Sequence, residues 1–292
     1  MLKKYFLSIL FIFLLLIYWV SNDLNLIWKD YFSVNFFDMK LWDWILIKTP
    51  NDKIILIDWW IWDQMISKIS KRMWFFERKI DYVFISHYDS DHLSWLLSVL
   101  KKFEIWEIFM LKIEKKTYLF RELINIINEK DIDIKFYSDL DSSEKTWNFY
   151  LDENLFFKKI FPDKNDIIAI IDKMKNGSLN KIKNYASVFE LEIWKSKTKF
   201  LFTWDIEKKI EKYLVENKKI EDIDYLKIPH HWSKTSSSTW FILITKPEFW
   251  IIMAAEKNKF HHPSEEIVER YDNLWVKLFQ TGKLWGIEFR IY

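Results

Sequence analysis

Four potential metal ligands fall within six positions of this sequence: His87, Asp89, Asp91 and His92. They follow the apolar run at 80–85, which is β-branched and aromatic and therefore predicts a buried strand. A helix-like segment begins directly after them, at 93–103, so the four groups crowd into one tight loop between the strand and the helix. Without a cation they would repel one another or be left unsatisfied, and the spacing therefore predicts a metal site.

Further polar clusters each follow a strand-like run. They are Asp205, the pair His230–His231 and the pair His261–His262. All 6 histidines of the chain thus lie in three clusters at strand ends, where one common site can gather them. Spacing alone leaves open whether one member of each pair is simply exposed or forms a hydrogen bond to a metal ligand without binding the metal itself.

Composition limits the chemistry. The chain has no cysteine, so any metal must be held by histidine and carboxylate groups. A length of 292 residues allows one large domain or two small ones. The net charge of +2 gives no global electrostatic reason to expect a nucleic acid as partner.

Tryptophan and glycine occur in abnormal numbers. The chain has 18 Trp and only 3 Gly, whereas glycine normally makes up about 7% of a protein. Several tryptophans stand at strand ends, where tight turns need the positive φ that glycine adopts easily: Trp59, Trp60, Trp204 and Trp232. We expect that many such positions are glycine in the organism, which would read UGA as glycine. The alternative is a protein that is truly rich in tryptophan.

The first 22 residues predict a membrane segment. Lys3 and Lys4 precede an apolar run at 5–20, which is close to the minimum length for a membrane span. No cleavage site of small residues follows, so we expect an uncleaved signal anchor, with a cleaved signal peptide as the alternative. A buried helix of the globular domain fits the unbroken apolarity less well. The lysines favour a cytoplasmic N-terminus and an extracytoplasmic remainder.

The rest of the chain predicts two sheets with helices outside them. Strand-like runs come first as hairpins and then alternate with helical patterns. The predicted strands lie at 31–37, 45–48, 53–57, 187–193, 199–202, 225–228, 249–254, 276–280 and 287–291. The predicted helices lie at 63–73, 93–103, 122–129, 206–216, 264–274 and, capped by residues 236–239, up to Thr245. The lysine-rich region 163–183 predicts an exposed insertion.

Several motifs in this order resemble the metallo-β-lactamase superfamily. With Trp read as Gly, residues 57–60 become I-D-G-G and residues 86–95 become S-H-x-D-x-D-H-L-S-G. Residues 201–205 become L-F-T-G-D, residues 229–237 become P-H-H-G-S-K-T-S-S, and residues 38–43 become D-x(3)-G-D. The resemblance covers roughly residues 31–292 and is closest to stand-alone relatives of the C-terminal hydrolase domain of the competence DNA-uptake channel protein, the ComEC type.

This resemblance implies an α/β (α+β) fold, a four-layer αββα sandwich with its metal site at one edge of the two sheets. It also implies two divalent ions, Zn²⁺ or Mn²⁺, with an activated hydroxide as nucleophile. By this resemblance, His87 and Asp89 bind the first ion, Asp91, His92 and His262 bind the second, and Asp205 bridges the two. His230 or His231 acts as general acid or binds the oxyanion, and Ser233, Lys234 and Asn184 contact the substrate. Asp58 supports the metal ligands without binding the metal.

Two departures from the superfamily pattern matter. Many members place another His ligand between the first motif and Asp205, but this chain has no histidine from 93 to 229, and residues 184–187 occupy that region. The first ion is therefore held less tightly, and ligation by Asp89 shifts the preference from Zn²⁺ towards Mn²⁺. In the other departure, Lys40 and Leu41 replace the Gly-Gln pair of the family's D-x-G-Q-G-D motif.

The resulting expectation is a membrane-anchored, metal-dependent hydrolase of phosphodiesters at residues 31–292, plausibly an extracytoplasmic nuclease linked to DNA uptake. A second expectation is hydrolysis of another ester, such as a phosphocholine ester or a lactone. A third is a binding module that keeps the fold without catalysis, which the retained acidic residues disfavour.

Overall fold

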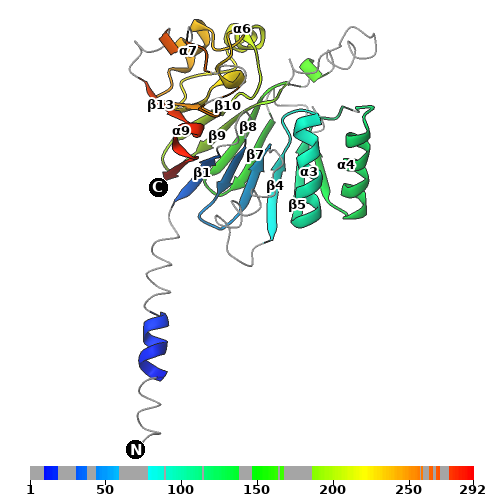
Figure 1. The fold of residues 1–292 in the computed structure, drawn as a ribbon, viewed down its shortest axis with the longest axis vertical. Helices are drawn as coiled ribbons and strands as arrows, with labels where there is room; N and C mark the ends of the chain where they lie inside the picture. The colour runs from blue at the N-terminus through cyan, green and yellow to red at the C-terminus, as the bar shows by residue number, and fades with distance from the viewer. Residues whose placement is uncertain are drawn as a thin grey trace, which may run out of the picture.

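The structure, a computed structural model, describes residues 10–18, 31–37, 44–58, 78–88, 90–113, 115–137, 147–163, 165–167, 186–256, 258, 263–265, 268–269 and 276–292. Within these ranges two seven-stranded sheets pack face to face, and helices cover their outer faces (Figure 1). The predicted α/β sandwich is therefore confirmed.

The first sheet has the strand order β14-β1-β2-β3-β4-β5-β6. Strands β3 to β6 are parallel to one another, whereas β14, β1, β2 and β3 pair in antiparallel fashion. Its strands are β1 (Phe32–Phe36), β2 (Ile45–Lys48), β3 (Ile54–Ile57), β4 (Lys79–Phe84), β5 (Glu104–Met110), β6 (Asp133–Phe136) and β14 (Ile287–Ile291).

The second sheet has the order β13-β12-β11-β10-β9-β8-β7. Strands β10 to β13 are parallel, and β7 to β10 form an antiparallel meander. Its strands are β7 (Trp147–Asp152), β8 (Leu155–Phe161), β9 (Val188–Ile193), β10 (Thr198–Phe202), β11 (Tyr225–Lys227), β12 (Phe249–Ile252) and β13 (Lys277–Gln280).

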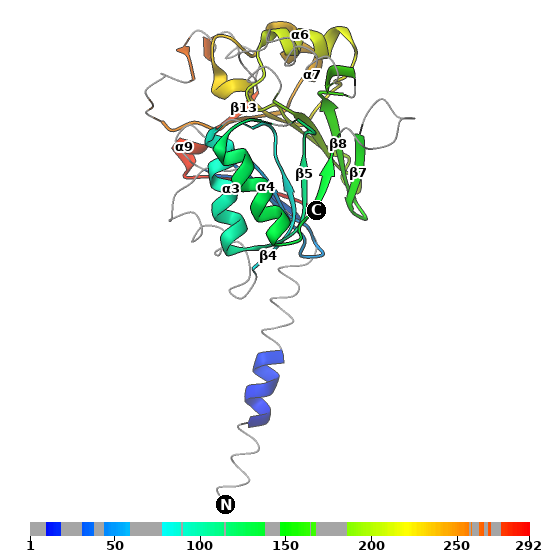
Figure 2. The same cartoon turned by 90° about the vertical axis from the view of Figure 1, so that its right-hand side faces the viewer.

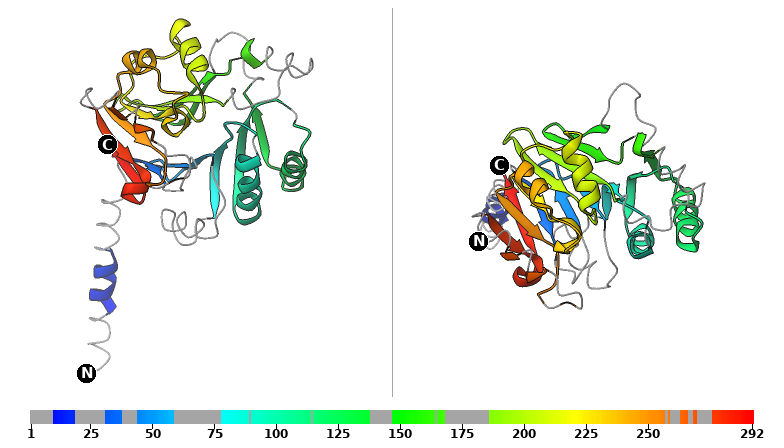
Figure 3. Two further views of the ribbon diagram at one scale, coloured as in Figure 1. Left: turned by 45° about the horizontal axis from the view of Figure 1, so that its top comes forward. Right: turned by 90° about the horizontal axis from the view of Figure 1, so that it is seen from above.

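Helices α3 (Ser90–Lys102) and α4 (Tyr118–Glu129) lie together on one outer side of the sandwich. Helices α6 (Lys208–Glu216) and α7 (Thr239–Thr245) lie together on the other side, as Figures 2 and 3 show. Two short helices, η2 (Pro229–Trp232) and α9 (Thr281–Leu284), lie within the sandwich domain. The layers follow the order predicted for an αββα sandwich.

Aromatic rings fill the space between the sheets. Phe84 of the first sheet stacks on Phe109 with ring centroids 4.5 Å apart and lies 4.2 Å from Phe157 of the second sheet. Phe36 and Phe202 meet in the same way, 6.2 Å apart. Because such rings bury large apolar areas, this layer supplies much of the hydrophobic stabilisation and fixes the position of β4, which leads into the predicted metal site.

Three sequence expectations need correction. The hairpin β7–β8 was not predicted, because Lys158 and Lys159 interrupt its apolar pattern, and yet Lys159 is buried. Ser90, Asp91 and His92 form the first turn of α3 and not a loop before the helix. The hydroxyl groups of residues 236–239 do not cap α7; the Glu211 carboxylate accepts the backbone N–H groups there, 2.5 Å from Ser237 and 2.7 Å from Ser238.

Residues 10–18 form a helix whose nine apolar side chains, from Leu10 to Tyr18, are each between 43% and 65% exposed. In the parts of the chain that the structure describes, no helix is both long and apolar enough to cross a membrane. Most of the predicted anchor at 1–22 lies outside the described residues, as do the predicted helix at 63–73 and nearly all of the insertion at 163–183 and the helix at 264–274.

Candidate metal-dependent active site

The described site residues follow the carboxyl ends of strands in both sheets. In the first sheet Asp58 follows β3 and His87 follows β4. In the second sheet Asp205 follows β10, and the pair His230–His231 follows β11. Because β3 and β4 are parallel, and β10 and β11 are parallel, each sheet brings its own residues to a single edge. Carboxyl ends of parallel strands are the usual position of sites in such sheets.

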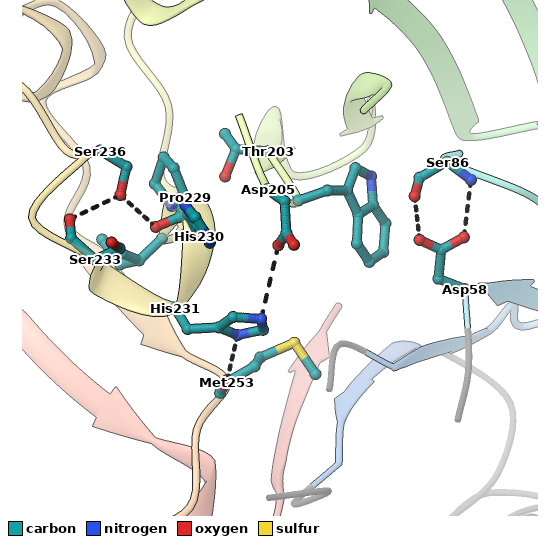
Figure 4. Close-up of polar contacts among 12 residues, drawn as sticks. Asp58, Ser86, Thr203, Asp205, Pro229, His230, His231, Ser233, Ser236 and Met253 are labelled. Atoms are coloured by element: carbon teal, nitrogen blue, oxygen red, sulfur yellow. Dashed lines mark hydrogen bonds and ion pairs between the residues drawn. The ribbon is translucent and has the colours of Figure 1, made fainter. Parts of the chain in front are cut away.

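Asp58, Ser86 and His87 form one buried network. Oδ1 of Asp58 accepts the backbone N–H of Ser86 at 2.8 Å, and Oδ2 accepts its hydroxyl (Figure 4). The Ser86 hydroxyl oxygen also lies 2.7 Å from Nδ1 of His87. Asp58 and Ser86 are fully buried, and His87 is 2% exposed. The Asp58 carboxylate and the Ser86 hydroxyl thus hold the His87 imidazole in place through its Nδ1.

The direction of these hydrogen bonds determines the tautomer of His87. The Ser86 hydroxyl donates to the Asp58 carboxylate, so its single proton points towards Asp58. Nδ1 of His87 must then donate to the Ser86 oxygen. In the neutral ring the lone pair is consequently on Nε2, which is the form in which an imidazole binds a metal ion.

In the second sheet, His231 lies between a carbonyl and a carboxylate. Its Nδ1 donates to the Met253 carbonyl at 2.9 Å, and its Nε2 lies 3.6 Å from Oδ1 of Asp205 (Figure 4). Met253 follows β12, so three neighbouring strand ends of the second sheet meet here. The 3.6 Å separation is an ion-pair distance and exceeds that of a hydrogen bond.

Charge converges on Asp205 from both sheets. Burial raises the pKa of Asp205, but the charges of His231, His230, His87 and Lys227 outweigh burial and hold this pKa well below its usual range. Asp205 is therefore ionised at neutral pH. The two hydrogen bonds from Ser187, next to β9, to the Ser86 carbonyl join the strand ends of the two sheets.

The loop after β11 presents the remaining predicted residues. Nδ1 of His230 lies 3.2 Å from the Thr235 hydroxyl, and the Ser233 hydroxyl lies 3.3 Å from that same oxygen. The Ser236 hydroxyl donates to the Pro229 carbonyl at 2.9 Å and so closes the loop. Lys234 is exposed. These predicted substrate contacts therefore form a polar rim beside His230.

This loop has a left-handed backbone. His230, His231 and Trp232 have φ values of 47°, 51° and 66°. Trp204, just before Asp205, has φ of 44°, and its carbonyl accepts the backbone N–H of His230 at 2.7 Å. Left-handed conformations cost a non-glycine residue roughly 1–2 kcal/mol. Trp204 and Trp232, which the sequence predicts to be glycine positions, thus have backbone conformations that suit glycine.

Several predicted residues cannot be placed. Asp89, Asn184, His261 and His262 lie outside the described residues, and only the backbone of Asp91 and His92 is described. Among the side chains that the structure describes, no group of three or more His, Cys, Asp or Glu residues could hold a metal ion. The predicted division of ligands between two ions therefore stays a prediction.

The described donors nevertheless fit a divalent cation. The network orients His87 with its lone pair on Nε2, and Asp205 is ionised. Imidazole and carboxylate donors suit Zn²⁺ and Mn²⁺. Asp58 reaches His87 through the Ser86 hydroxyl, and its expected supporting role stays a prediction.

Two polar residues at this edge were not identified from the sequence. Lys227 is 1% exposed, and its ammonium donates to the carbonyls of Trp204 and Ile228, each at 3.4 Å. Its signal was a lysine inside the apolar run 225–228. Ser187, immediately before β9, donates to the Ser86 carbonyl through its N–H at 3.1 Å and its hydroxyl at 2.9 Å.

Comparison with solved structures identifies the fold. Igni18, a metallo hydrolase from the archaeon Ignicoccus hospitalis, superposes with a TM-score of 0.55 at 12% identity over 90% of this chain and 100% of that one. CmlA, a diiron β-hydroxylase from Streptomyces venezuelae, gives 0.53 at 10% identity over 90% of this chain and 54% of that one. Identities this low show a shared fold and no more.

In sequence, no family model matches the chain. A segment of 91 residues, 31% of the chain, is 29% identical to ComE operon protein 3 of Bacillus subtilis (strain 168) and spans only 12% of that protein. The resemblance predicted from the motifs is confirmed: the chain has the metallo-β-lactamase type of fold and a local similarity to ComE operon protein 3.

Proposed function

We propose that this chain is a metal-dependent hydrolase of phosphodiester bonds. One observation carries the proposal: His231 lies 3.6 Å from the Asp205 carboxylate at the strand ends of the second sheet, and at the strand ends of the first sheet Asp58 and Ser86 orient His87 with its lone pair on Nε2. Titratable groups gathered in this way at strand ends are typical of active sites and uncommon in purely structural clusters. The fold shared with a metallo hydrolase supports this interpretation.

The residues have distinct roles in this proposal. His87 and Asp89 would hold a first ion, Asp91, His92 and His262 would hold a second, and Asp205 would be a ligand of both. When bound, such ions lower the pKa of a water molecule and so supply a nucleophile at neutral pH. His231, supported by the Met253 carbonyl, is placed to move a proton next to Asp205, and His230 faces the polar rim.

A phosphodiester is the preferred substrate because the rim beside His230 offers groups that suit an anion. Lys234 is exposed there, and the Ser233 hydroxyl lies in the same loop, 3.3 Å from the hydroxyl of Thr235. Asn184 would contribute from the region before Ser187. Hydrolysis of a phosphocholine ester or a lactone is the competing activity, and a non-catalytic binding module is the alternative from another class.

The test compares substrates under the same metal conditions. Protein with glycine at the tryptophan positions encoded by UGA is assayed on bis-p-nitrophenyl phosphate, single-stranded DNA and a lactone, with Mn²⁺ or Zn²⁺. We expect turnover of the phosphodiesters that chelation abolishes, and a loss of at least about 100-fold in the Asp205→Asn variant. Asp224→Asn is the matched control, because Asp224 accepts the N–H of Lys199 at 2.7 Å near the amino end of β11, away from the site.

The outcomes separate the three candidates. Turnover of the lactone alone selects the competing ester hydrolase. No turnover of any substrate, in protein that binds metal, selects the binding module and overturns the enzyme proposal. Equal activity in the Asp205→Asn and Asp224→Asn variants overturns the assignment of the site.

We further propose that residues 1–22 anchor the domain in the cytoplasmic membrane as a single pass, with the hydrolase on the extracytoplasmic side. Nine consecutive exposed apolar side chains at 10–18 support this, because water is an unfavourable surrounding for them. A secreted protein is the alternative. A nuclease in this position could serve DNA uptake. If the full chain washes off membranes at high pH as readily as a chain lacking residues 1–22, the anchor is wrong.

Glycine at many tryptophan positions is part of the same proposal. Trp204, Trp232 and Trp285 all have positive φ, with Trp285 at 59° in the left-handed position that ends α9, where glycine is the usual residue. Trp204 is also fully buried, and its indole N–H has no hydrogen-bond partner among the described groups. The coding DNA decides, since UGG at these three positions would exclude recoding there.

A further inference from the structure

Ser86 is the residue on which the hydrogen bonds around His87 meet. Its N–H and its hydroxyl both donate to Asp58, its hydroxyl oxygen accepts from His87, and its carbonyl accepts two hydrogen bonds from Ser187. Every polar atom of this fully buried residue is therefore engaged. Three separate strand ends determine the orientation of the peptide that leads into His87.

The contact with Ser187 differs from the others because it crosses between the sheets. Ser86 follows β4 of the first sheet, whereas Ser187 immediately precedes β9 of the second sheet. The hydroxyl of Ser187 donates at 2.9 Å and its N–H at 3.1 Å, both to the same carbonyl oxygen. Ser187 is fully buried, so water cannot replace these bonds without a local opening.

Two hydrogen bonds to one carbonyl fix the plane of the peptide between Ser86 and His87. The orientation of this plane sets the direction in which the His87 side chain leaves the backbone. The hydroxyl of Ser86, which determines the tautomer of His87, is attached to the same residue. A shift of the peptide would consequently disturb both the position of the imidazole and the nitrogen that carries its lone pair.

We propose that Ser187 is a positioning residue that clamps the Ser86 carbonyl across the two sheets and so holds His87 in its metal-binding orientation. The clamp occupies the part of the chain in which many superfamily members place a further histidine. Here a serine acts through the neighbouring backbone and not as a ligand. The metal-binding consequence rests on the proposed function, whereas the clamp itself concerns only the fold.

The experiment measures both parts. Hydrogen exchange of the backbone amides at 78–88 is followed in metal-free protein, and Mn²⁺ affinity is measured by titration, for the full chain and its Ser187→Ala variant. We expect about 10-fold faster exchange at Ser86 and His87 and about 10-fold weaker Mn²⁺ binding in S187A. Ser187→Thr, which retains the hydroxyl, should restore both values.

Ser33→Ala is the matched control. Ser33 is also buried, and its hydroxyl donates to Oε1 of Glu288 at 2.9 Å in a pairing of strands β1 and β14, away from residues 86–87. S33A should change neither value. If S187A fails to fold, Ser187→Cys replaces it, because cysteine retains the approximate volume but donates a hydrogen bond weakly.

Unchanged exchange at Ser86 and His87 in S187A, or in S187C where that variant is used, overturns the clamp, as does a Ser187→Thr variant that exchanges as fast as S187A. If exchange accelerates but Mn²⁺ affinity does not change, the clamp exists and does not position a ligand, which overturns its proposed purpose. If the unaltered protein binds no Mn²⁺, the proposed function fails, while the exchange measurement still decides the clamp.

Discussion

The two halves of the candidate site are held in place by different means. In the first sheet, Asp58, Ser86 and His87 are at most 2% exposed and are joined by side-chain hydrogen bonds. In the second sheet, the side chains of Asp205 and His231 are 18% and 12% exposed and meet at 3.6 Å as an ion pair. The first half is thus a hydrogen-bonded network, and the second half depends on charge.

The backbone differs in the same sense. In the first half Asp58 has a positive φ of 42° but no residue from 84 to 88 does, whereas Trp204 and residues 230–232 in the second half are all left-handed. The first half is therefore organised mainly by the hydrogen bonds of its side chains. The second half is organised by backbone conformation, so its geometry depends on which residues can adopt that conformation at low cost.

The largest effect should come from removing the acceptor of the first half. Asp58→Ala leaves the buried N–H and hydroxyl of Ser86 without their partner, which should lower the free energy of unfolding by about 2–5 kcal/mol in urea titrations. Asp81→Ala is the control, because Asp81 is a buried carboxylate near the amino ends of β3 and β4 that accepts one backbone N–H, that of Ile54, at 2.9 Å. If D81A lowers the free energy of unfolding as much as D58A does, the hydrogen-bonded network does not stabilise the first half more than any buried carboxylate would.

The second half should respond to glycine and in the opposite direction. Trp204→Gly and Trp232→Gly remove left-handed tryptophans and should each raise the free energy of unfolding by about 1–2 kcal/mol, if glycine is the natural residue. If tryptophan is natural, each change would leave a cavity and cost about 3–5 kcal/mol. A rise or a fall in the free energy of unfolding therefore tests whether glycine is the natural residue, independently of the codons in the DNA.

Trp250→Gly separates the backbone effect from the removal of an indole. Trp250 is as deeply buried as Trp232 but lies in the extended backbone of β12. Glycine there should destabilise, because it creates a cavity and weakens a strand. A stabilising effect of the same size at all three positions would mean that left-handed backbone is not the cause.

Much of the fold could be predicted from local pattern. The apolar runs that became β3 and β9 are β-branched or aromatic and end at turn residues, and each motif was expected at a strand end because polar groups followed an apolar run. The hairpin β7–β8 was missed because burial of Lys159 depends on polar and aromatic partners that an apolar pattern does not reveal. Its ammonium donates to the Pro162 carbonyl, lies near Asp163 and contacts the ring of Tyr137, and periodicity gives no information on such contacts.

The candidate site shows the same limit. Motif spacing identified His87, Asp205 and the histidine pair, since ligands must stand at fixed offsets from their strands. It could not identify Ser187 as the partner of Ser86, because 101 positions separate them and only the packing of the two sheets joins them. Lys227 was missed for a related reason: its environment is set by the loop of Trp204, a neighbour in the sheet but not in the sequence.

The smallest effect is expected at the junction between the halves, where Lys159 of β8 lies over the ring of Tyr137, with Nζ 4.9 Å from the ring centroid. The Tyr137 hydroxyl bonds to the carbonyls of Phe109 at 3.0 Å and Ile85 at 3.3 Å, next to Ser86. Burial lowers the pKa of Lys159 to about 7, although Asp163 and Asp166 act in the opposite direction. Because the unfolded chain binds this proton more tightly, the contribution of Lys159 to stability should rise with pH from about 7 to about 10.5.

Lys159→Met should therefore stabilise the protein by about 1–2 kcal/mol below pH 7, and the gain should shrink as the pH rises above 7. Urea titrations between pH 6 and pH 9 measure it, with Lys158→Met as the control, since Lys158 is on the same strand but is partly exposed beside Glu190. A gain in K159M that does not change with pH would mean that Lys159 is not buried as an ammonium. If K159M also leaves amide hydrogen exchange at Ile85 and Ser86 unchanged, the contact between Lys159 and Tyr137 stabilises the sandwich without affecting the first half of the site. The two halves are then independent at this contact.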